Sequence, residues 1–154
     1  MISTTPVLFD ALAATPVLAG LSQEALKLLA DEGIVHDFLR DEVVVREGDT
    51  GHSLYILVEG DVEVIKNLES PHAVTLATLH SRNFFGEMCV IDPVPRAATV
   101  YAISEVRAIE IKAATLHHLF KQMPEQYAIV LLNIARDMVR RLRALDAAFA
   151  ARAS

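Results

Sequence analysis

The residues best able to do chemistry lie together in one stretch, residues 84–100, which reads FFGEMCVIDPVPRAATV. It places an acid, Glu87, directly after a glycine, and an arginine, Arg96, directly after a proline that restricts the backbone. A one-turn helix beginning at Glu87 would direct unpaired backbone N–H groups toward the space that Arg96 faces. The stretch therefore predicts an anion pocket, in which Glu87 either pairs with Arg96 or accepts hydrogen bonds from the hydroxyl groups of a ligand.

Helices are predicted on the N-terminal side of this stretch, within residues 1–33. The Thr-Pro pair at residues 5–6 is typical of a helix start, and the Thr-Pro pair at residues 15–16 is typical of a break. Ser22 is a suitable N-cap for a second helix, which is expected to end before Gly33.

The central part of the chain, residues 34–111, consists of short β-branched segments separated by turn sequences such as residues 48–51 and 59–61. The segments predicted as strands are 34–39, 42–46, 54–58, 61–66, 73–79, 97–102 and 106–111. Strands that recur about every ten residues are typical of an antiparallel barrel or jelly roll. The expected fold class is therefore α+β, an antiparallel β jelly roll flanked by N-terminal helices and a long C-terminal helix.

Helical periodicity returns over residues 112–154, where Pro124 begins a long segment. Apolar residues in that segment follow the 3, 4 spacing of a coiled coil, and we call them the heptad seam: Ala128, Leu131, Ala135, Met138, Leu142, Leu145 and Phe149. A second apolar set lies off the seam and is expected to face the barrel: Ile129, Leu132 and Val139. The heptad seam would then meet a partner helix, giving a homodimer through residues 128–149, or cover the mouth of its own barrel.

The composition limits the classes of partner. The 154 residues are enough for one domain over residues 1–154, and a chain with 53% apolar and 22% charged residues is expected to fold. The net charge of −6 argues against a nucleic-acid polymer as partner. Cys89 is the single cysteine, and no apolar run approaches the ~20 residues of a membrane span. We therefore expect a cytoplasmic protein without disulfides and without membrane association.

Positive charge gathers near the C-terminus, in contrast to the acidic remainder of the chain. The arginines concerned are Arg136, Arg140, Arg141 and Arg143. They are expected to lie in solvent beside the heptad seam, with binding of an acidic partner as the alternative.

Residues 84–100 closely resemble the phosphate-binding cassette of the cyclic nucleotide-binding domain family. That family includes the catabolite activator proteins and the regulatory subunits of cyclic-AMP-dependent protein kinase. Residues 48–49, Gly-Asp, and residues 54–60, LYILVEG, also match the barrel pattern of the family, so the resemblance spans nearly the whole chain. It implies a non-catalytic sensor of a cyclic nucleotide, cyclic AMP first and cyclic GMP second, with no other cofactor.

The resemblance also implies roles within residues 85–100, which we call the cassette. Glu87 is expected to accept the ribose 2′-hydroxyl, and Gly86 to let the sugar approach closely. Arg96 is expected to clamp the cyclic phosphate, helped by the backbone N–H groups of Cys89 and Ala97. The complete expected ligand-binding set is Gly86, Glu87, Met88, Cys89, Arg96, Ala97, Ala98, Val64 and Leu76, with no metal ligands.

Base recognition is expected to rest on apolar side chains. By similarity, Val64 and Leu76 would line the wall under the base, although core packing is the commoner role of such residues. Relatives selective for cyclic GMP often carry Thr at the position of Ala97, so this sequence favours cyclic AMP. Catabolite activators present a Thr-Ser pair to the adenine where this chain has Leu145 and Asp146.

The bacterial activators continue from the long helix into a DNA-binding domain, and no second apolar-periodic segment follows before Ser154. We therefore expect a stand-alone module whose C-terminal helix signals to an effector protein on another chain. One alternative is a docking module that keeps the cassette but needs no ligand. Another is a metal-dependent jelly-roll enzyme, which would need a His-x-His pair and a nearby acid, a spacing that the histidines do not show. No catalytic residue is expected.

Overall fold

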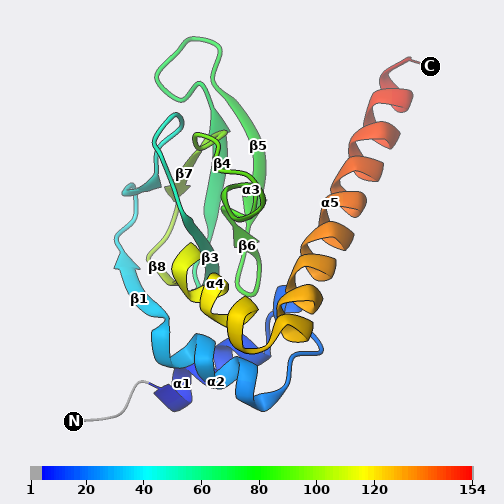
Figure 1. The fold of residues 1–154 in the computed structure, drawn as a ribbon. Coiled ribbons are helices and arrows are strands. Elements are labelled where there is room, and N and C mark those ends of the chain that lie inside the picture. The colour runs from blue at the N-terminus through cyan, green and yellow to red at the C-terminus, as the bar shows by residue number, and fades with distance from the viewer. Residues whose placement is uncertain (1–4, 154) are drawn as a thin grey trace.

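Two four-stranded antiparallel sheets form the centre of the molecule in a computed structural model that describes residues 5–153 (Figure 1). The strands are β1 (Ile34–Phe38), β2 (Val43–Val45), β3 (Ser53–Glu59), β4 (Val62–Lys66), β5 (Val74–Leu79), β6 (Phe84–Phe85), β7 (Thr99–Ala102) and β8 (Val106–Lys112). One sheet has the order β1-β8-β3-β6, and the other has the order β2-β7-β4-β5. The predicted α+β fold with an antiparallel jelly roll is confirmed.

Strand β6 is the one strand that the sequence pattern did not predict. Its two residues pair with β3, Phe85 with Tyr55 and Phe84 with Ile56. Both phenylalanines are buried, and they enter different apolar clusters on the two faces of the sheet. A strand of two residues is too short to show a period of two, so no alternation could reveal it.

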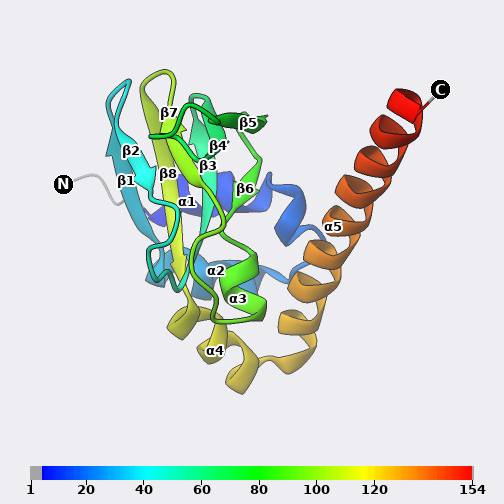
Figure 2. The same ribbon diagram turned by 90° about the horizontal axis from the view of Figure 1, so that it is seen from above.

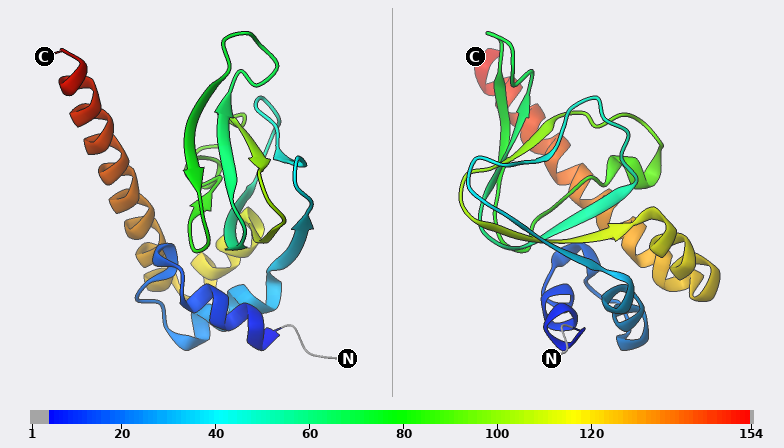
Figure 3. Two further views of the ribbon diagram at one scale, coloured as in Figure 1. Left: turned by 180° about the vertical axis from the view of Figure 1, so that it is seen from behind. Right: turned by 90° about the vertical axis from the view of Figure 1, so that its left-hand side faces the viewer.

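Helices flank the strands at both ends of the chain, and one short helix lies between β6 and β7. They are α1 (Thr5–Ala13), η1 (Pro16–Leu18), α2 (Gln23–Glu32), α3 (Met88–Ile91), α4 (Ala113–Gln122) and α5 (Pro124–Ala153). The Ser22 hydroxyl accepts a hydrogen bond from the Ala25 N–H at 3.1 Å, so the predicted N-cap is present. Figure 3 shows α1, α2 and α4 gathered at one end of the sheets, with α5 rising from that end beside the strands.

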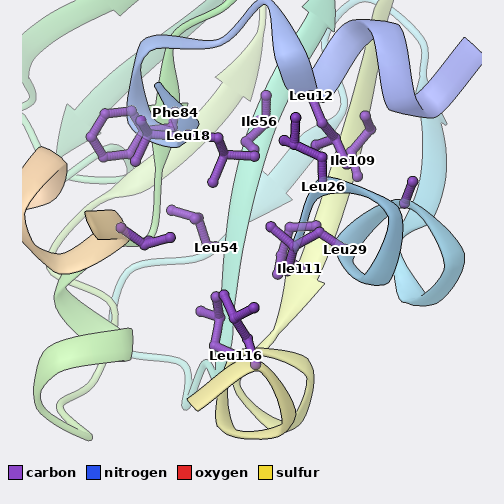
Figure 4. Close-up of a cluster of buried hydrophobic side chains, with 14 of the residues drawn as sticks. Leu12, Leu18, Leu26, Leu29, Leu54, Ile56, Phe84, Ile109, Ile111 and Leu116 are labelled. Atoms are coloured by element: carbon purple, nitrogen blue, oxygen red, sulfur yellow. The ribbon is translucent and has the colours of Figure 1, made fainter. Parts of the chain in front are cut away.

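The largest apolar core lies between these helices and the sheet that contains β3 and β8. Leu54 and Ile56 on β3 face the same way as Ile109 and Ile111 on β8, as the alternation of a strand requires (Figure 4). The helices contribute the other members of this cluster, including Leu12, Leu18, Leu26, Leu29 and Leu116. Each large aliphatic side chain buried in this way contributes about 1.5–3 kcal/mol. This core fixes the base on which the cassette and α5 are mounted.

Helix α5 is packed into the apolar core along its first half. Val130 and Ile134 are fully buried, and the Asn133 amide donates hydrogen bonds to the carbonyl oxygens of Val17 and Ala19 at 3.0 and 2.9 Å. Beyond this point the helix diverges from the sheets and ends far from them (Figure 2). The anchored half of α5 therefore positions the second half near the cassette without burying it.

The residues that anchor α5 differ from those expected. Leu132 and Val139, which were predicted to face the barrel, are 49% and 51% exposed, so that prediction was wrong for both. Helix α5 crosses η1, and the face of the helix that packs there carries Val130 and Ile134. These two residues are therefore the buried ones. The later part of the heptad seam stays in solvent: Met138, Leu142, Leu145 and Phe149 are 41%, 59%, 67% and 77% exposed.

Candidate functional site

A cavity of about 650 Å³ lies between the cassette, the β4–β5 hairpin and the second half of α5. All nine residues of the expected ligand-binding set line it: Gly86, Glu87, Met88, Cys89, Arg96, Ala97, Ala98, Val64 and Leu76. Its other lining residues are Val45, Ala77, Leu79, Phe85, Pro95, Val100, Arg141, Ala144 and Leu145. The lining is mostly apolar with a few convergent charged groups, as is typical of a small-molecule site.

The cassette leaves strand β6 through a sharp turn and forms one short helix. Gly86 has a φ of +87°, a left-handed conformation that a residue with a Cβ rarely adopts. The one-turn helix predicted to begin at Glu87 is α3, which begins one residue later with Glu87 as its N-cap, and the Cys89 N–H donates to the Gly86 carbonyl at 3.2 Å. The Cys89 thiol is buried and forms no disulfide.

The backbone of Arg96 is clamped by the loop before β3. Its N–H donates to the Asp49 carbonyl, and its own carbonyl accepts from the Gly48 N–H, both at 2.8 Å. Pro95 forms a bridge with Thr50 in the same loop. Residues 48–50 therefore align the backbone of Arg96 from a point more than forty positions away in the chain.

The side chain of Arg96 is almost entirely buried, with 8% of the residue exposed. Its Nη1 donates to the backbone carbonyl of Ser53 at 3.2 Å, and its Cζ lies 5.8 Å from the centroid of the Tyr55 ring. The guanidinium passes between two glycines: a Cβ on Gly51 would overlap it, and a Cβ on Gly86 would lie 2.6 Å from Nη1. Gly51 was predicted only as part of a turn, yet the structure shows that its missing side chain makes room for Arg96.

Glu87 pairs with the C-terminal helix. Arg141 Nη1 on α5 donates to Glu87 Oε1 at 2.9 Å, while Arg141 Nε contacts Asp137 Oδ2 at 2.7 Å. The Arg141 guanidinium also lies 5.4 Å from the centroid of the Phe84 ring. The Arg141 side chain is 45% exposed, as predicted for the arginines of this helix, but its guanidinium also reaches back to the buried acid of the cassette, a contact that was not predicted.

Apolar side chains close the remaining sides of the cavity. Val64 and Leu76 lie on β4 and β5, and Leu76 is 58% exposed because β5 is at the edge of its sheet. Leu145 lines the cavity from α5, although two thirds of the residue is exposed. Met88 presents a third half-exposed apolar side chain from α3. The cavity thus has a charged end at Arg96 and Glu87 and an apolar end between β4, β5 and α5.

Neither a metal site nor a membrane-spanning helix is present within residues 5–153. No three His, Cys, Asp or Glu side chains in this range lie close enough together to hold a metal ion. None of the helices in the same range has the length and apolar character that crossing a lipid bilayer requires.

Comparisons with known proteins identify the family. Residues 35–123, which include β1 to α4 and the cassette, match the family model described as the cyclic nucleotide-binding domain. A CRP-like cAMP-activated global transcriptional regulator of Mycobacterium tuberculosis is 28% identical over 134 residues, which are 87% of this chain and 58% of that protein. A cAMP-dependent protein kinase regulatory subunit of Dictyostelium discoideum is 35% identical over 94 residues, 59% of this chain and 29% of that protein. The chain thus spans less than two thirds of either relative.

Solved structures agree with the family match. The N-terminal domain of a transcriptional regulator from Streptomyces coelicolor is 28% identical, with a TM-score of 0.74 over 88% of this chain and 95% of that one. A cyclic nucleotide-binding domain from Methylobacillus flagellatus shares the fold, with a TM-score of 0.78 at 24% identity over 91% of this chain and 79% of that one. On the family match and this fold, the chain belongs to the cyclic nucleotide-binding domain family.

Proposed function

We propose that this chain is a non-catalytic sensor that binds a cyclic nucleotide, cyclic AMP in preference to cyclic GMP, in the cavity beside the cassette. The observation that carries the proposal is that Arg96 and Glu87 lie in one cavity with an apolar wall opposite them. A cyclic nucleotide has one phosphate charge, one ribose hydroxyl and one flat base. These three parts match an arginine, a carboxylate and an apolar surface.

The phosphate is assigned to Arg96. A guanidinium has five N–H donors, and the Ser53 carbonyl uses only one contact at Nη1, so donors remain for phosphate oxygens. Burial keeps water from competing, which strengthens a charge-assisted hydrogen bond. Backbone N–H groups of Cys89 and Ala97 would add to this end, and the 3.2 Å bond from Cys89 to the Gly86 carbonyl is long enough to be exchanged for a phosphate oxygen.

The ribose is assigned to Glu87. Its Oε1 is engaged by Arg141, which leaves Oε2 to accept the 2′-hydroxyl. The Glu87→Ala variant should therefore bind cyclic AMP more weakly and lose much of the preference for it over its 2′-deoxy analogue, because the acceptor for that hydroxyl is gone. A variant that discriminates as the parent does would assign Glu87 a structural role only.

The base is assigned to the apolar end, between Val64 and Leu76 on the hairpin and Leu145 on α5. These side chains offer contact area without donors or acceptors. Ala97 offers no hydroxyl to a guanine, which favours adenine. Leu145 stands where the catabolite activators present the Thr of a Thr-Ser pair, so this chain would cover the base by apolar contact.

Calorimetric titration of the parent with cyclic AMP, cyclic GMP and cyclic di-GMP tests the proposal. Cyclic AMP is expected to bind most tightly. Arg96→Ala should weaken its binding by ~2–5 kcal/mol, which is roughly 30- to 5,000-fold, with the fold retained. Arg107→Ala is the matched control, since Arg107 is an exposed arginine that pairs with Asp37, and neither residue lines the cavity. A parent that binds none of the three, or an Arg96→Ala variant with parental affinity, would refute the proposal.

The output is assigned to the second half of α5. Its exposed part of the heptad seam, from Met138 to Phe149, is apolar and continuous with Leu145 at the cavity wall. We assign this surface to a homodimer through residues 128–149 and, through the same helix, to an effector protein on another chain. One relative is named a cAMP-activated regulator and another a cAMP-dependent protein kinase regulatory subunit. Both names support a signalling role for this chain. A docking module that needs no ligand is the rival, and the same titration separates the two.

A further inference from the structure

Behind the cassette, polar side chains meet inside the otherwise apolar barrel. The Glu110 carboxylate on β8 has two partners: the Ser53 hydroxyl on β3, at 2.5 Å from Oε2, and His36 Nε2 on β1, at 2.8 Å from Oε1. The Glu110 side chain is 15% exposed. Burying a carboxylate costs free energy unless its oxygens are hydrogen-bonded, so these two partners hold it in place.

The same carboxylate also acts on the aromatic side chain next to it. Glu110 lies directly opposite Tyr55 in the β3–β8 register, and Tyr55 stacks on Phe85 with ring centroids 5.1 Å apart. Burial and the neighbouring Glu110 carboxylate both raise the pKa of Tyr55. Burial alone would raise the pKa of Glu110 as well, but hydrogen bonds from Ser53 and His36 outweigh it and lower that pKa below its ordinary value. Glu110 is therefore a fixed anion on β8 that faces the start of β3.

This polar group is connected to the phosphate end of the cavity by Ser53 and Tyr55. The backbone carbonyl of Ser53 accepts from Arg96 Nη1, while the hydroxyl of the same residue donates to Glu110. The Tyr55 ring lies under the Arg96 guanidinium, at 5.8 Å from Cζ to the ring centroid. Of these two groups, Ser53 is held by the hydrogen bond to Glu110, and Tyr55 lies directly opposite Glu110 in the sheet.

We propose that Glu110 is a positioning residue for the cassette: held by His36, it fixes Ser53, and Ser53 together with the Tyr55 ring fixes the guanidinium of Arg96. The Arg96 side chain has little room for other conformations, because Gly51 and Gly86 border it on both sides. The contact of the guanidinium with the Ser53 carbonyl is long for a hydrogen bond, 3.2 Å, so a small movement of Ser53 would break it. A guanidinium fixed before the ligand arrives loses less freedom on binding.

The inference rests on the proposed function for its effect on affinity, but its first test needs no ligand. Side-chain Nε–Hε correlation spectra report the surroundings of each arginine, and the Arg96 resonance is assigned by its loss in Arg96→Lys. In the parent this resonance is expected to stand apart from those of exposed arginines. In Glu110→Ala it should move toward them, and in Glu110→Gln it should stay near the parental position, because an amide can still accept from Ser53 and donate to His36.

Asp37→Ala is the matched control. Asp37 and Arg107 form a second ion pair across the same two strands, at 2.8 Å, but both side chains are substantially exposed and face away from Ser53. The variant thus removes a carboxylate from β1 that is not connected to Arg96 through Ser53. Its Arg96 resonance should therefore be unchanged. Ser53→Ala is the milder variant if Glu110→Ala unfolds, since it removes only the hydroxyl that joins Ser53 to Glu110.

The second test measures cyclic AMP affinity. Glu110→Ala should weaken binding about three- to tenfold, the effect of losing one good hydrogen bond, and Glu110→Gln should restore most of it. In an Arg96→Lys background the effect of Glu110→Ala on affinity should vanish, because Glu110 acts through the Arg96 guanidinium, which that background lacks. An unmoved Arg96 resonance in both Glu110→Ala and Ser53→Ala, or an undiminished effect in the Arg96→Lys background, would overturn the inference. If the parent binds no cyclic nucleotide while the resonance moves as expected, the proposed function fails and the positioning role stands.

Discussion

The Arg141 guanidinium on α5 donates to the Glu87 carboxylate of the cassette, with 2.9 Å between Nη1 and Oε1, although the two residues are 54 positions apart in the chain. This contact ties the far half of α5, which is largely exposed, to the wall of the cavity. Through this contact, ligand binding in the cavity can change the position of the helix, and movement of the helix can change the cavity.

Removing this tie should affect both the helix and the cavity. Arg141→Ala leaves the buried Glu87 carboxylate without its cationic partner and frees α5 after Ile134, so hydrogen exchange over residues 137–153 should become faster. Because the Arg141 side chain is 45% exposed, solvent screens the pair, and we expect only about a three- to tenfold loss of cyclic AMP affinity.

Arg140→Ala is the control for this variant, since Arg140 is an exposed neighbour on the same helix. It should change neither the exchange rates nor the affinity. If Arg141→Ala behaves like Arg140→Ala in both measurements, the contact with Glu87 has no part in binding or in holding the helix.

A methyl group at Gly51 should displace Arg96. The backbone at this glycine is not left-handed, so alanine fits the chain, but its Cβ would overlap the Arg96 guanidinium. Overpacking of this kind costs about 1–3 kcal/mol of folding free energy, and the displaced guanidinium should lose cyclic AMP affinity as Arg96→Ala does. Chemical denaturation and titration measure the two effects.

The Arg96→Ala background provides the control for Gly51→Ala. There the overlap is gone, so the added methyl group should cost little stability. An equal cost in both backgrounds would show that Gly51 is needed for the turn and not for the arginine.

Selectivity for the base should respond to the residue after Arg96. Ala97→Thr places a hydroxyl beside the cavity and should shift the preference toward cyclic GMP by about 1–1.5 kcal/mol, hence about tenfold, the net value of one good hydrogen bond. Ala97→Val, of the same shape without the hydroxyl, is the control, and competition titration with both nucleotides is the measurement. A shift that is equal in the two variants, or absent, would mean that the base is held elsewhere.

The heptad seam should control association. Leu142 is 59% exposed, so Leu142→Glu costs a single chain little, whereas in a dimer through residues 128–149 it would bury a charge in the seam. Sedimentation should find a dimer for the parent and a monomer for the variant, which keeps its affinity for cyclic AMP because the cassette is untouched. A parent that is monomeric with and without cyclic AMP would eliminate the dimer.

Much of this molecule follows from local sequence alone. Within residues 5–153, periods of two and of 3.6 residues, Ser22 as N-cap and the proline and glycine signals identified all helices of eight residues or more and seven of the eight strands. The cassette was recognisable as a continuous stretch, because its glycine, acid and arginine lie within eleven residues. Every residue expected from it, with Val64 and Leu76 from the hairpin, lines one cavity.

The tertiary structure decided which distant groups meet. The sequence marks Arg141 as one arginine among several, and only the path of α5 across η1 brings it to Glu87. Gly51 appears as a turn residue until the Arg96 side chain is placed beside it, and Glu110 as an ordinary strand residue until His36 and Ser53 surround it. A heptad pattern likewise states that a face is apolar but not what covers it. Local patterns reflect the backbone of neighbouring residues, whereas these contacts depend on how whole elements pack, and that information is spread over the entire chain.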